Sequence, residues 1–215
     1  MEGRSSKELL EAVDLTTIEW PVSMWFNHGF DAMIRIRELS DVVFKDPGGR
    51  RRADGRWPLV IDPSGTSSKF FTYSGATKFT LAELQAHEDD ELEDRLRRAF
   101  LKGLLHGGAV VIDLEGFEFS LETVGIPFDR IENRLFEKLC DRSVLYSYLM
   151  PRRFLSLVTS DLETDFASFL FDDEHVAAFV LCFVMSRPEP DPDFAGNFYT
   201  IRVRDISKQE IAEME

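Results

Sequence analysis

A helix pattern that runs directly into an all-apolar strand constrains this chain more than any other feature. Large apolar side chains recur every fourth residue from Leu92 to Leu104, which is the spacing of one helix face. Gly107-Gly108 then ends the helix, and the run AVVID (109–113) follows at once. Because a strand without polar alternation is typically buried on both faces, this unit predicts a parallel sheet covered by helices.

Other segments extend the same pattern. The apolar runs Trp57–Asp62 and Ala177–Ser186 predict further buried strands, and the alternation in Phe198–Val203 predicts the last strand. We expect a helix from about Ser67, a helix over Asp129–Leu139 and further helices between Arg142 and Phe171. The domain organisation we expect is an N-terminal helix and aromatic, basic lead-in (1–55), one α/β domain (56–204) and a polar tail (205–215).

The composition limits the classes of partner that the chain is expected to bind. The chain has a formal net charge of −14, so it repels nucleic-acid backbones and anionic membranes. With 44% hydrophobic residues it can bury a proper core, and its apolar runs fall short of a membrane span. We expect protein partners, no nucleic acid, no membrane and a cytoplasmic location. The two cysteines, Cys140 and Cys182, are typical of buried thiols in a reducing compartment.

The loop after the first buried strand is reminiscent of a phosphate loop. A working loop follows the pattern G-x-x-x-x-G-K-[ST], in which backbone N–H groups and lysine hold phosphate and the hydroxyl binds Mg²⁺. In PSGTSSKFF (63–71) the lysine is Lys69, with Pro63 and Ser68 at the glycine positions and Phe70 at the Ser/Thr position. Proline has no N–H to donate and phenylalanine cannot bind a metal, so the site is degenerate.

A second acidic element follows the strand 109–113. Asp113 stands where such folds hold Mg²⁺ through water, and Glu115 comes one position later than the residue that activates the attacking water. The candidate vestigial nucleotide site is therefore Gly65, Ser68 and Lys69 for phosphate, with Asp113 and Glu115 for Mg²⁺. Each has a simpler alternative: Lys69 as a surface lysine, and the two acids as the polar end of a buried strand.

Further readings stay open beside that site. Asp62 can instead cap the turn that follows it, and Ser186 stands where a polar sensor would lie at the end of a strand. The basic run Arg50–Arg52 suits a solvated loop or an acidic partner. The histidines lack ligand spacing, so we expect no metal site and no catalytic residue.

The segment Arg56–Phe71 (RWPLVIDPSGTSSKFF) closely resembles the R-W-P-L-x-I-D-P-x-G-x-A-x-K segment of the fifth AAA+ module of dynein heavy chains. The module is also similar to the C-terminal region of IQ-motif and ankyrin-repeat domain proteins. The downstream order of helix, apolar strand, second apolar strand with a proline-rich loop, and terminal strand fits as well. The resemblance covers about two thirds of the chain. It implies a parallel-sheet, P-loop NTPase-like fold, that of a large AAA+ subdomain.

In dyneins this module is a structural member of the ring, so the resemblance implies a non-catalytic interaction or scaffold module, a pseudo-ATPase. It also implies microtubule- or dynein-associated partners in a cytoskeletal or ciliary setting. The chain has no IQ motif or ankyrin repeat, and we expect no helical lid after its last strand. We expect no cofactor. The alternative is an ATP-binding protein that uses Mg²⁺ with weak or no hydrolysis. A third reading is a small-molecule or metal-dependent enzyme that uses Asp62 and Asp113 at the carboxyl ends of strands.

Overall fold

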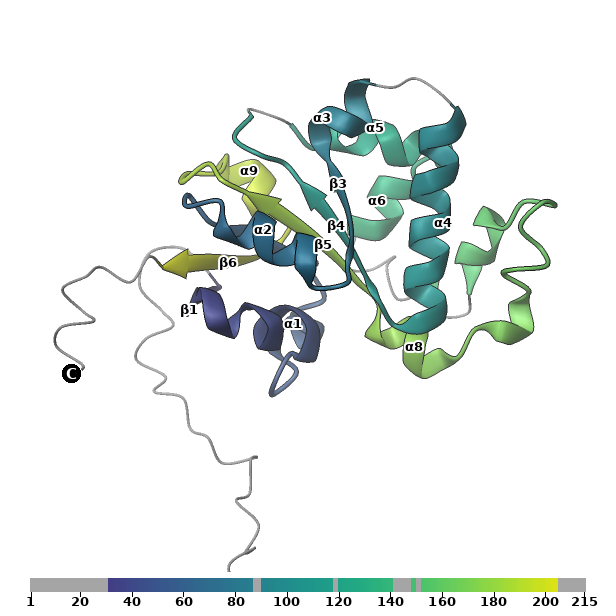
Figure 1. Ribbon diagram of the computed structural model, residues 1–215, viewed down its shortest axis with the longest axis horizontal. Coiled ribbons are helices and arrows are strands. Elements are labelled where there is room, and N and C mark those ends of the chain that lie inside the picture. Colours follow the sequence, from purple (N-terminus) through teal and green to yellow (C-terminus); the bar gives the residue numbers. More distant parts are fainter. Residues whose placement is uncertain (1–30, 87–89, 118–119, 141–147, 150–151, 205–215) are drawn as a thin grey trace, which may run out of the picture.

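The structure is a computed structural model, and it describes residues 31–86, 90–117, 120–140, 148–149 and 152–204 (Figure 1). The predicted N-terminal helix, the aromatic stretch Trp20–Phe30 and the polar tail 205–215 lie outside the described residues. Among the helices that are described, none is long and apolar enough to span a membrane.

One sheet of six parallel strands organises the described part of the chain, in the order β1-β6-β2-β5-β4-β3 (Figure 1). The predicted α/β class with a parallel sheet is therefore confirmed. The strands are β1 (Ala32–Arg35), β2 (Pro58–Ile61), β3 (Thr77–Thr80), β4 (Ala109–Asp113), β5 (Val180–Met185) and β6 (Tyr199–Arg204).

Helices connect the strands. The α-helices are α1 (Arg50–Asp54), α2 (Thr66–Tyr73), α3 (Leu81–Ala86), α4 (Asp90–His106), α5 (Leu121–Ile131), α6 (Leu135–Cys140), α8 (Asp173–Ala178) and α9 (Pro192–Ala195). Shorter turns of 3-10 helix cover Ile36–Glu38 (η3), Arg153–Leu157 (η5) and Ser168–Leu170 (η6), and one π-helical turn covers Asp41–Lys45 (η4).

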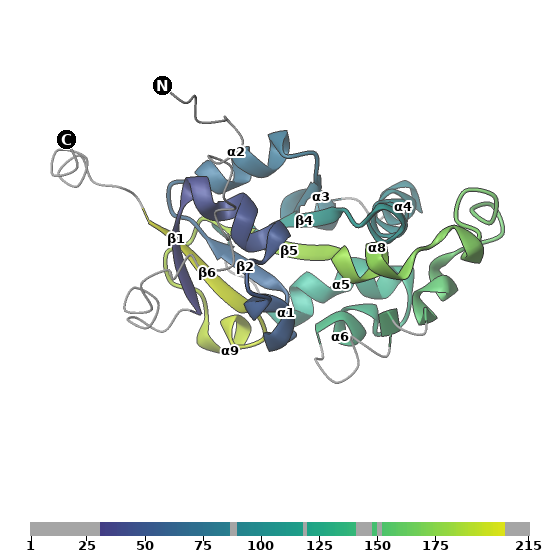
Figure 2. The same ribbon diagram turned by 90° about the horizontal axis from the view of Figure 1, so that it is seen from below.

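The core divides into two layers because successive strand residues point to opposite faces of the sheet. On β2, Leu59 and Ile61 belong to the larger cluster, which also holds the buried faces of α4, α5 and α6. Val60 belongs to the smaller cluster, with Phe71 of α2 and Val43 of η4. In Figure 2, α2 accordingly lies on one side of the sheet, with α6 and α9 on the other.

The strongest predictions from the sequence are confirmed. The run 109–113 is β4, and β2 and β5 are buried at every position. The four-residue repeat of α4 points into the core, since Leu92, Leu96, Phe100 and Leu104 are each at most 5% exposed. Gly107 follows the helix with φ of +65°, as a helix stop requires.

The edge strand β3 was not predicted, whereas β1 lies at the start of the segment 33–44, whose pattern has some strand character. The sheet thus reaches back to Ala32, N-terminal of the expected domain start at residue 56. The basic run Arg50–Arg52, expected in a solvated loop, instead forms most of α1, with Arg51 buried. The predicted helix Asp129–Leu139 is wrong: α5 ends at Ile131 and α6 begins at Leu135, with Arg134 in the left-handed region between them. Between 152 and 171 the described residues form turns and two short 3-10 helices, so the helical segments expected for 142–171 are confirmed there only in short pieces.

Candidate functional site

The candidate site lies at the carboxyl edge of β2, β4 and β5. The chain leaves β2 toward β3 in one direction, whereas it leaves β5 toward β6 on the far side of β2. The connections that follow these two neighbouring strands thus run in opposite directions, and open α/β sheets bind ligands at such switch points. The loop 62–65 lies at that point, between β2 and α2.

The loop 62–65 folds around the carboxylate of Asp62. Asp62 Oδ1 accepts from the backbone N–H of Ser64 (3.0 Å) and from its hydroxyl (2.7 Å), and Oδ2 accepts from the N–H of Ser67 (2.6 Å). The N–H of Gly65 donates to the Asp62 carbonyl (3.0 Å), and that of Thr66 to Ser64 Oγ (3.2 Å). Four consecutive backbone donors are thus engaged inside the loop, so the reading of Asp62 as a cap agrees with the geometry.

These hydrogen bonds also set the charge state of Asp62. Burial by itself would raise the pKa of its carboxyl group, but the donors at Ser64 and Ser67 outweigh burial, and the pKa lies below its ordinary value. An ionised carboxylate therefore occupies the position from which backbone amides of a phosphate loop would hold an anion.

A second ionic group lies at the end of β4, which is separated from β2 by β5. Ser68 Oγ donates a hydrogen bond to Asp113 Oδ2, so these two predicted site residues are in contact. Lys78 of β3 completes the group: its Nζ lies 3.0 Å from Ser68 Oγ, 3.3 Å from the Ser68 carbonyl and 3.4 Å from Asp113 Oδ2. Both partners of the ion pair are largely shielded, with side chains 20% (Lys78) and 7% (Asp113) exposed.

A lysine that the sequence did not single out takes the place expected for Lys69. Lys69, the lysine aligned with the phosphate-loop motif, is exposed on α2, while Lys78 provides the ammonium group at the site. Sequence reasoning missed Lys78 because it belongs to an unpredicted edge strand. The signal that could have found it is the alternation in TKFT (77–80), where Phe79 is buried and its neighbours are not.

Glu115 and Gly65, the remaining predicted residues, are backbone features of the site. Gly65 precedes α2 with φ of +69°. Glu115 also has positive φ (+55°), its N–H donates to Asp113 Oδ1 (3.0 Å), and its carbonyl accepts from the N–H of Ser186 (2.8 Å). Its Oε2 atom is buried without a hydrogen-bond partner in the described part of the chain. This backbone hydrogen bond places Ser186 next to Glu115.

The residues described offer no ready-made metal centre: they contain no group of three or more His, Cys, Asp or Glu side chains placed to hold an ion. The charged side chains that occupy the site determine its chemistry. A carboxylate fills the loop, and an ammonium group lies against Ser68, which was predicted to hold phosphate, and against Asp113, which was predicted to hold Mg²⁺.

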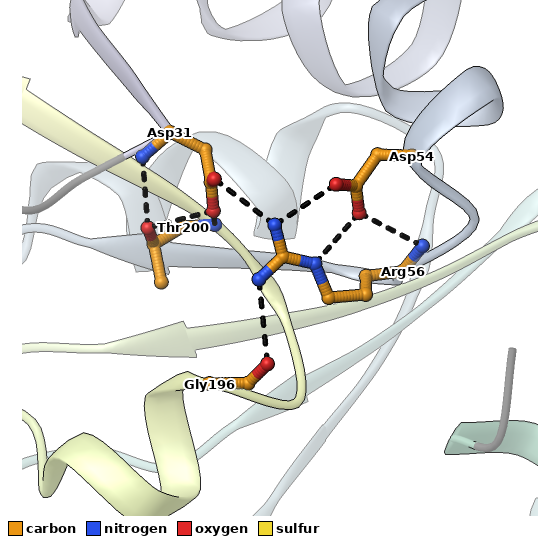
Figure 3. Close-up of polar contacts among 5 residues, drawn as sticks. All are labelled: Asp31, Asp54, Arg56, Gly196 and Thr200. Carbon is orange, nitrogen blue, oxygen red and sulfur yellow. Dashed lines mark hydrogen bonds and ion pairs between the residues drawn. The ribbon is translucent and has the colours of Figure 1, made fainter. Parts of the chain in front are cut away.

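Arg56, the first residue of the segment that carries the resemblance, lies at the opposite edge of the sheet, before β2. Its guanidinium donates to Asp54 (Nε to Oδ1, 2.6 Å), to Asp31 (Nη2 to Oδ1, 2.9 Å) and to the carbonyl of Gly196 (3.3 Å) (Figure 3). Asp31 in turn accepts from the N–H of Thr200 on β6 (2.8 Å). Arg56 thus links the segments that lead into β1, β2 and β6.

A scan against protein-family models finds none that matches this chain.

Proposed function

We propose that the chain is a non-catalytic, dynein-related AAA+-like module, a pseudo-ATPase that serves protein–protein interaction. Charged side chains of the chain itself fill its degenerate nucleotide site. The observation that carries the proposal is that two charged side chains at the carboxyl edge of the sheet occupy the places of phosphate and of a metal ion. The carboxylate of Asp62 takes the backbone donors that phosphate needs, and the ammonium group of Lys78 takes the place beside Asp113 that a metal needs.

The finer fold assignment, a P-loop NTPase-like large AAA+ subdomain, is part of this proposal. Its supports are the all-parallel sheet, the position of the loop 62–65 at the switch point, and the contact between Ser68 and Asp113 across the site. The cytoskeletal or ciliary setting and the microtubule- or dynein-associated partners rest on the sequence resemblance of Arg56–Phe71.

Thermal unfolding with Mg·ATP tests the closed site. A ligand at 100 times its Kd stabilises the folded state by roughly 2.7 kcal/mol, which is readily measured. We expect no saturable change in Tm for the wild type with millimolar Mg·ATP. We expect Asp62→Ala, which frees the N–H groups of Ser64 and Ser67, to gain a response to inorganic phosphate or Mg·ATP. A wild-type response that Lys69→Ala abolishes contradicts the proposal.

The second candidate is an ATP-binding protein with weak or no hydrolysis. The observation in its favour is that Lys69 is exposed on the first turns of α2, where a long side chain can reach a phosphate group outside the loop. A Lys69-dependent, Mg²⁺-dependent rise in Tm would establish it. Affinity purification with mass spectrometry tests the interaction role, and the resemblance predicts recovery of microtubule- or dynein-associated proteins.

A further inference from the structure

One face of the sheet is left uncovered where β1 and β6 lie side by side, at the end away from α4 (Figure 1). Ala32 and Ile34 of β1, with Ile201 and Val203 of β6, all belong to the smaller core cluster. The residues that alternate with them point the other way, and neither strand contributes a described residue to the larger cluster. Because an all-parallel sheet is normally covered on both faces, this two-strand face is an exception among the described strands.

The uncovered face, which we call the β1–β6 face, carries mainly arginine. Met33 lies opposite Arg202 in the strand register, and Arg35 lies opposite Arg204. Arg204 is exposed, the other three side chains are partly buried, and Arg204 Nε lies against the sulfur of Met33. Neighbouring strands are about 4.8 Å apart, so Arg35 and Arg204 place two cations side by side at the carboxyl end of the face.

These two arginines differ from others in the chain because they lack an acidic partner. Several arginines form ion pairs with carboxylates, among them Arg56, Arg98 and Arg152. Arg35 and Arg204 form none with any residue that the structure describes, although the chain has 39 acidic residues against 25 basic ones. The carboxylate of Glu38 instead accepts from the backbone N–H of Arg35 (2.9 Å).

The pairing of Arg35 with Arg204 is not explained by the needs of the fold. Like charges that face each other across neighbouring strands destabilise a sheet. Arg202, between them and the core, is held in place by a hydrogen bond from its Nη1 to the carbonyl of Pro188 (2.5 Å). The β1–β6 face therefore presents a fixed group of guanidinium ions that an anionic surface would neutralise.

We propose that the β1–β6 face binds an acidic helix of a partner protein. A helix is about 10 Å wide, which is the width of two strands, and helices are what normally cover parallel sheets. Carboxylates on its lower side can form bidentate pairs with Arg35 and Arg204, and a small apolar residue can lie on Met33. Nucleic acid is disfavoured, because a long polyanion would also meet the rest of a chain whose net charge is −14.

This inference supplies a surface for the interaction role proposed above, but it does not depend on the filled nucleotide site. Asp62, Ser68, Lys78 and Asp113 take no part in it, and its test uses no nucleotide. Failure of the Mg·ATP experiment and failure of the helix binding are therefore separate results.

Fluorescence anisotropy of a labelled peptide, titrated with the full chain, tests the proposal. The probe is an alanine-rich helical peptide of about 15 residues with glutamates along one side, and its control carries glutamine at the same positions. We expect saturable binding of the glutamate peptide, which weakens as salt is added, and no binding of the glutamine peptide.

Single substitutions locate the binding. We expect Arg35→Gln and Arg204→Gln each to weaken binding of the glutamate peptide by about tenfold, because each removes charged hydrogen bonds. Arg153→Gln is the matched control: it removes an exposed arginine from η5 with the same change in net charge, and should leave binding unchanged. Arg35→Gln and Arg204→Gln should leave Tm unchanged or raise it, since they relieve the repulsion between like charges.

Four outcomes overturn the proposal. The first is equal binding of the glutamate and glutamine peptides, or of neither, and the second is an equal loss of binding in Arg153→Gln and Arg204→Gln. The third is a clear fall in Tm for Arg35→Gln and Arg204→Gln, which would assign both arginines to the fold. The fourth is a dimer in sedimentation velocity that Arg204→Gln abolishes, which would assign the face to a second copy of the chain.

Discussion

The backbone N–H of Ser67 donates to Asp62 Oδ2 over 2.6 Å, so the first turn of α2 is held by a carboxylate from the end of the preceding strand. Ser67 and Asp62 are both buried. A short, charge-assisted hydrogen bond of this kind is roughly twice as strong as a neutral one. The loop therefore keeps its shape without a bound anion, and the closed conformation is part of the folded state.

The first prediction concerns the contribution of this carboxylate to stability. Asp62→Ala leaves the N–H groups of Ser64 and Ser67 without their acceptor, and we expect the free energy of unfolding to fall by roughly 2–4 kcal/mol. Asp62→Asn keeps one acceptor oxygen and should lose about half as much. Urea denaturation measures both, and a loss below about 0.5 kcal/mol for Asp62→Ala would contradict the cap.

The second prediction follows from the lowered pKa of Asp62. A carboxyl group whose folded pKa lies below its unfolded value of about 3.9 stabilises the protein above that pH, and this contribution is lost as pH falls through the folded pKa. We expect the unfolding free energy of the wild type to drop below about pH 4. The Asp62→Asn variant should drop less steeply over the same window.

If the unfolding free energies of the wild type and Asp62→Asn fell equally steeply with pH in acid, the acid sensitivity would belong to other carboxyl groups. Glu132 is the main competitor, since hydrogen bonds from Lys138 and Ser156 overcome burial and lower its pKa. A Glu132→Gln variant run beside Asp62→Asn separates the two contributions.

The buried strands and α4 could be predicted because their signals are local. Every residue of β2 and β5 is buried, and α4 repeats its apolar residues over four turns. The edge strand β3 could not, because its sequence TKFT buries a single side chain, Phe79, and becomes a strand through its pairing with β4. Such pairing joins residues far apart in sequence, which short-range patterns do not record.

The break between α5 and α6 shows the opposite failure. The periodicity of Leu135, Phe136 and Leu139 is that of a helix, but Asp129 Oδ1 accepts from the N–H of Phe136 (3.0 Å) and Arg134 adopts φ of +58°. A side-chain acceptor thus replaces the continuing helix. Pro127 lies inside α5, a position where sequence rules expect a helix to end.

The candidate site was predicted only where its residues belong to strong elements. Ser68 follows β2 and Asp113 is the last residue of β4. The contact between them therefore follows from the parallel sheet. Lys78 is 35 positions from Asp113 and resembles any surface lysine in the sequence. Its role follows only from the pairing of β3 with β4, which brings the ammonium group to the edge of the site.

The third prediction tests the ion pair of Lys78 and Asp113. Lys78→Met leaves a buried carboxylate without its cation, and we expect a loss of roughly 1–3 kcal/mol in unfolding free energy. Asp113→Asn in the Lys78→Met background should recover part of that loss, which a double-mutant cycle measures as coupling. Lys69→Ala is the control for removing a lysine and should cost less than about 0.5 kcal/mol. If the effects of Lys78→Met and Asp113→Asn on the unfolding free energy were additive, the ion pair would make no contribution to stability.

The fourth prediction concerns Arg56, whose pKa is raised first by its hydrogen bond to Asp54 and then by Asp31. Arg56→Ala removes the contacts that hold β1 against β2 and β6, and we expect a loss of roughly 2 kcal/mol or more in thermal or urea unfolding. Arg56→Lys should not restore stability, because lysine lacks the planar fork that reaches both aspartates. The matched control is Arg134→Ala, whose ion pair with Glu137 is exposed on both sides and worth little.

The last prediction concerns Gly103, on the buried face of α4. A Cβ placed there lies 2.6 Å from an edge carbon of Phe179. That ring is fixed by edge contacts with Trp57 and Phe100, at centroid distances of 5.7 and 4.8 Å. Alanine favours a helix over glycine by about 1 kcal/mol, but overpacking of a core costs about 1–3 kcal/mol. We therefore expect Gly103→Ala to destabilise the protein.

The control for Gly103→Ala is the same substitution in a Phe179→Leu background, where the smaller side chain leaves room for the methyl group. There the helix preference of alanine should prevail, and Gly103→Ala should raise the unfolding free energy measured in urea. A stabilising effect of Gly103→Ala in the wild-type background would mean that the Phe179 ring moves at little cost, and that the contact between α4 and the start of β5 is looser than its buried aromatic cluster indicates.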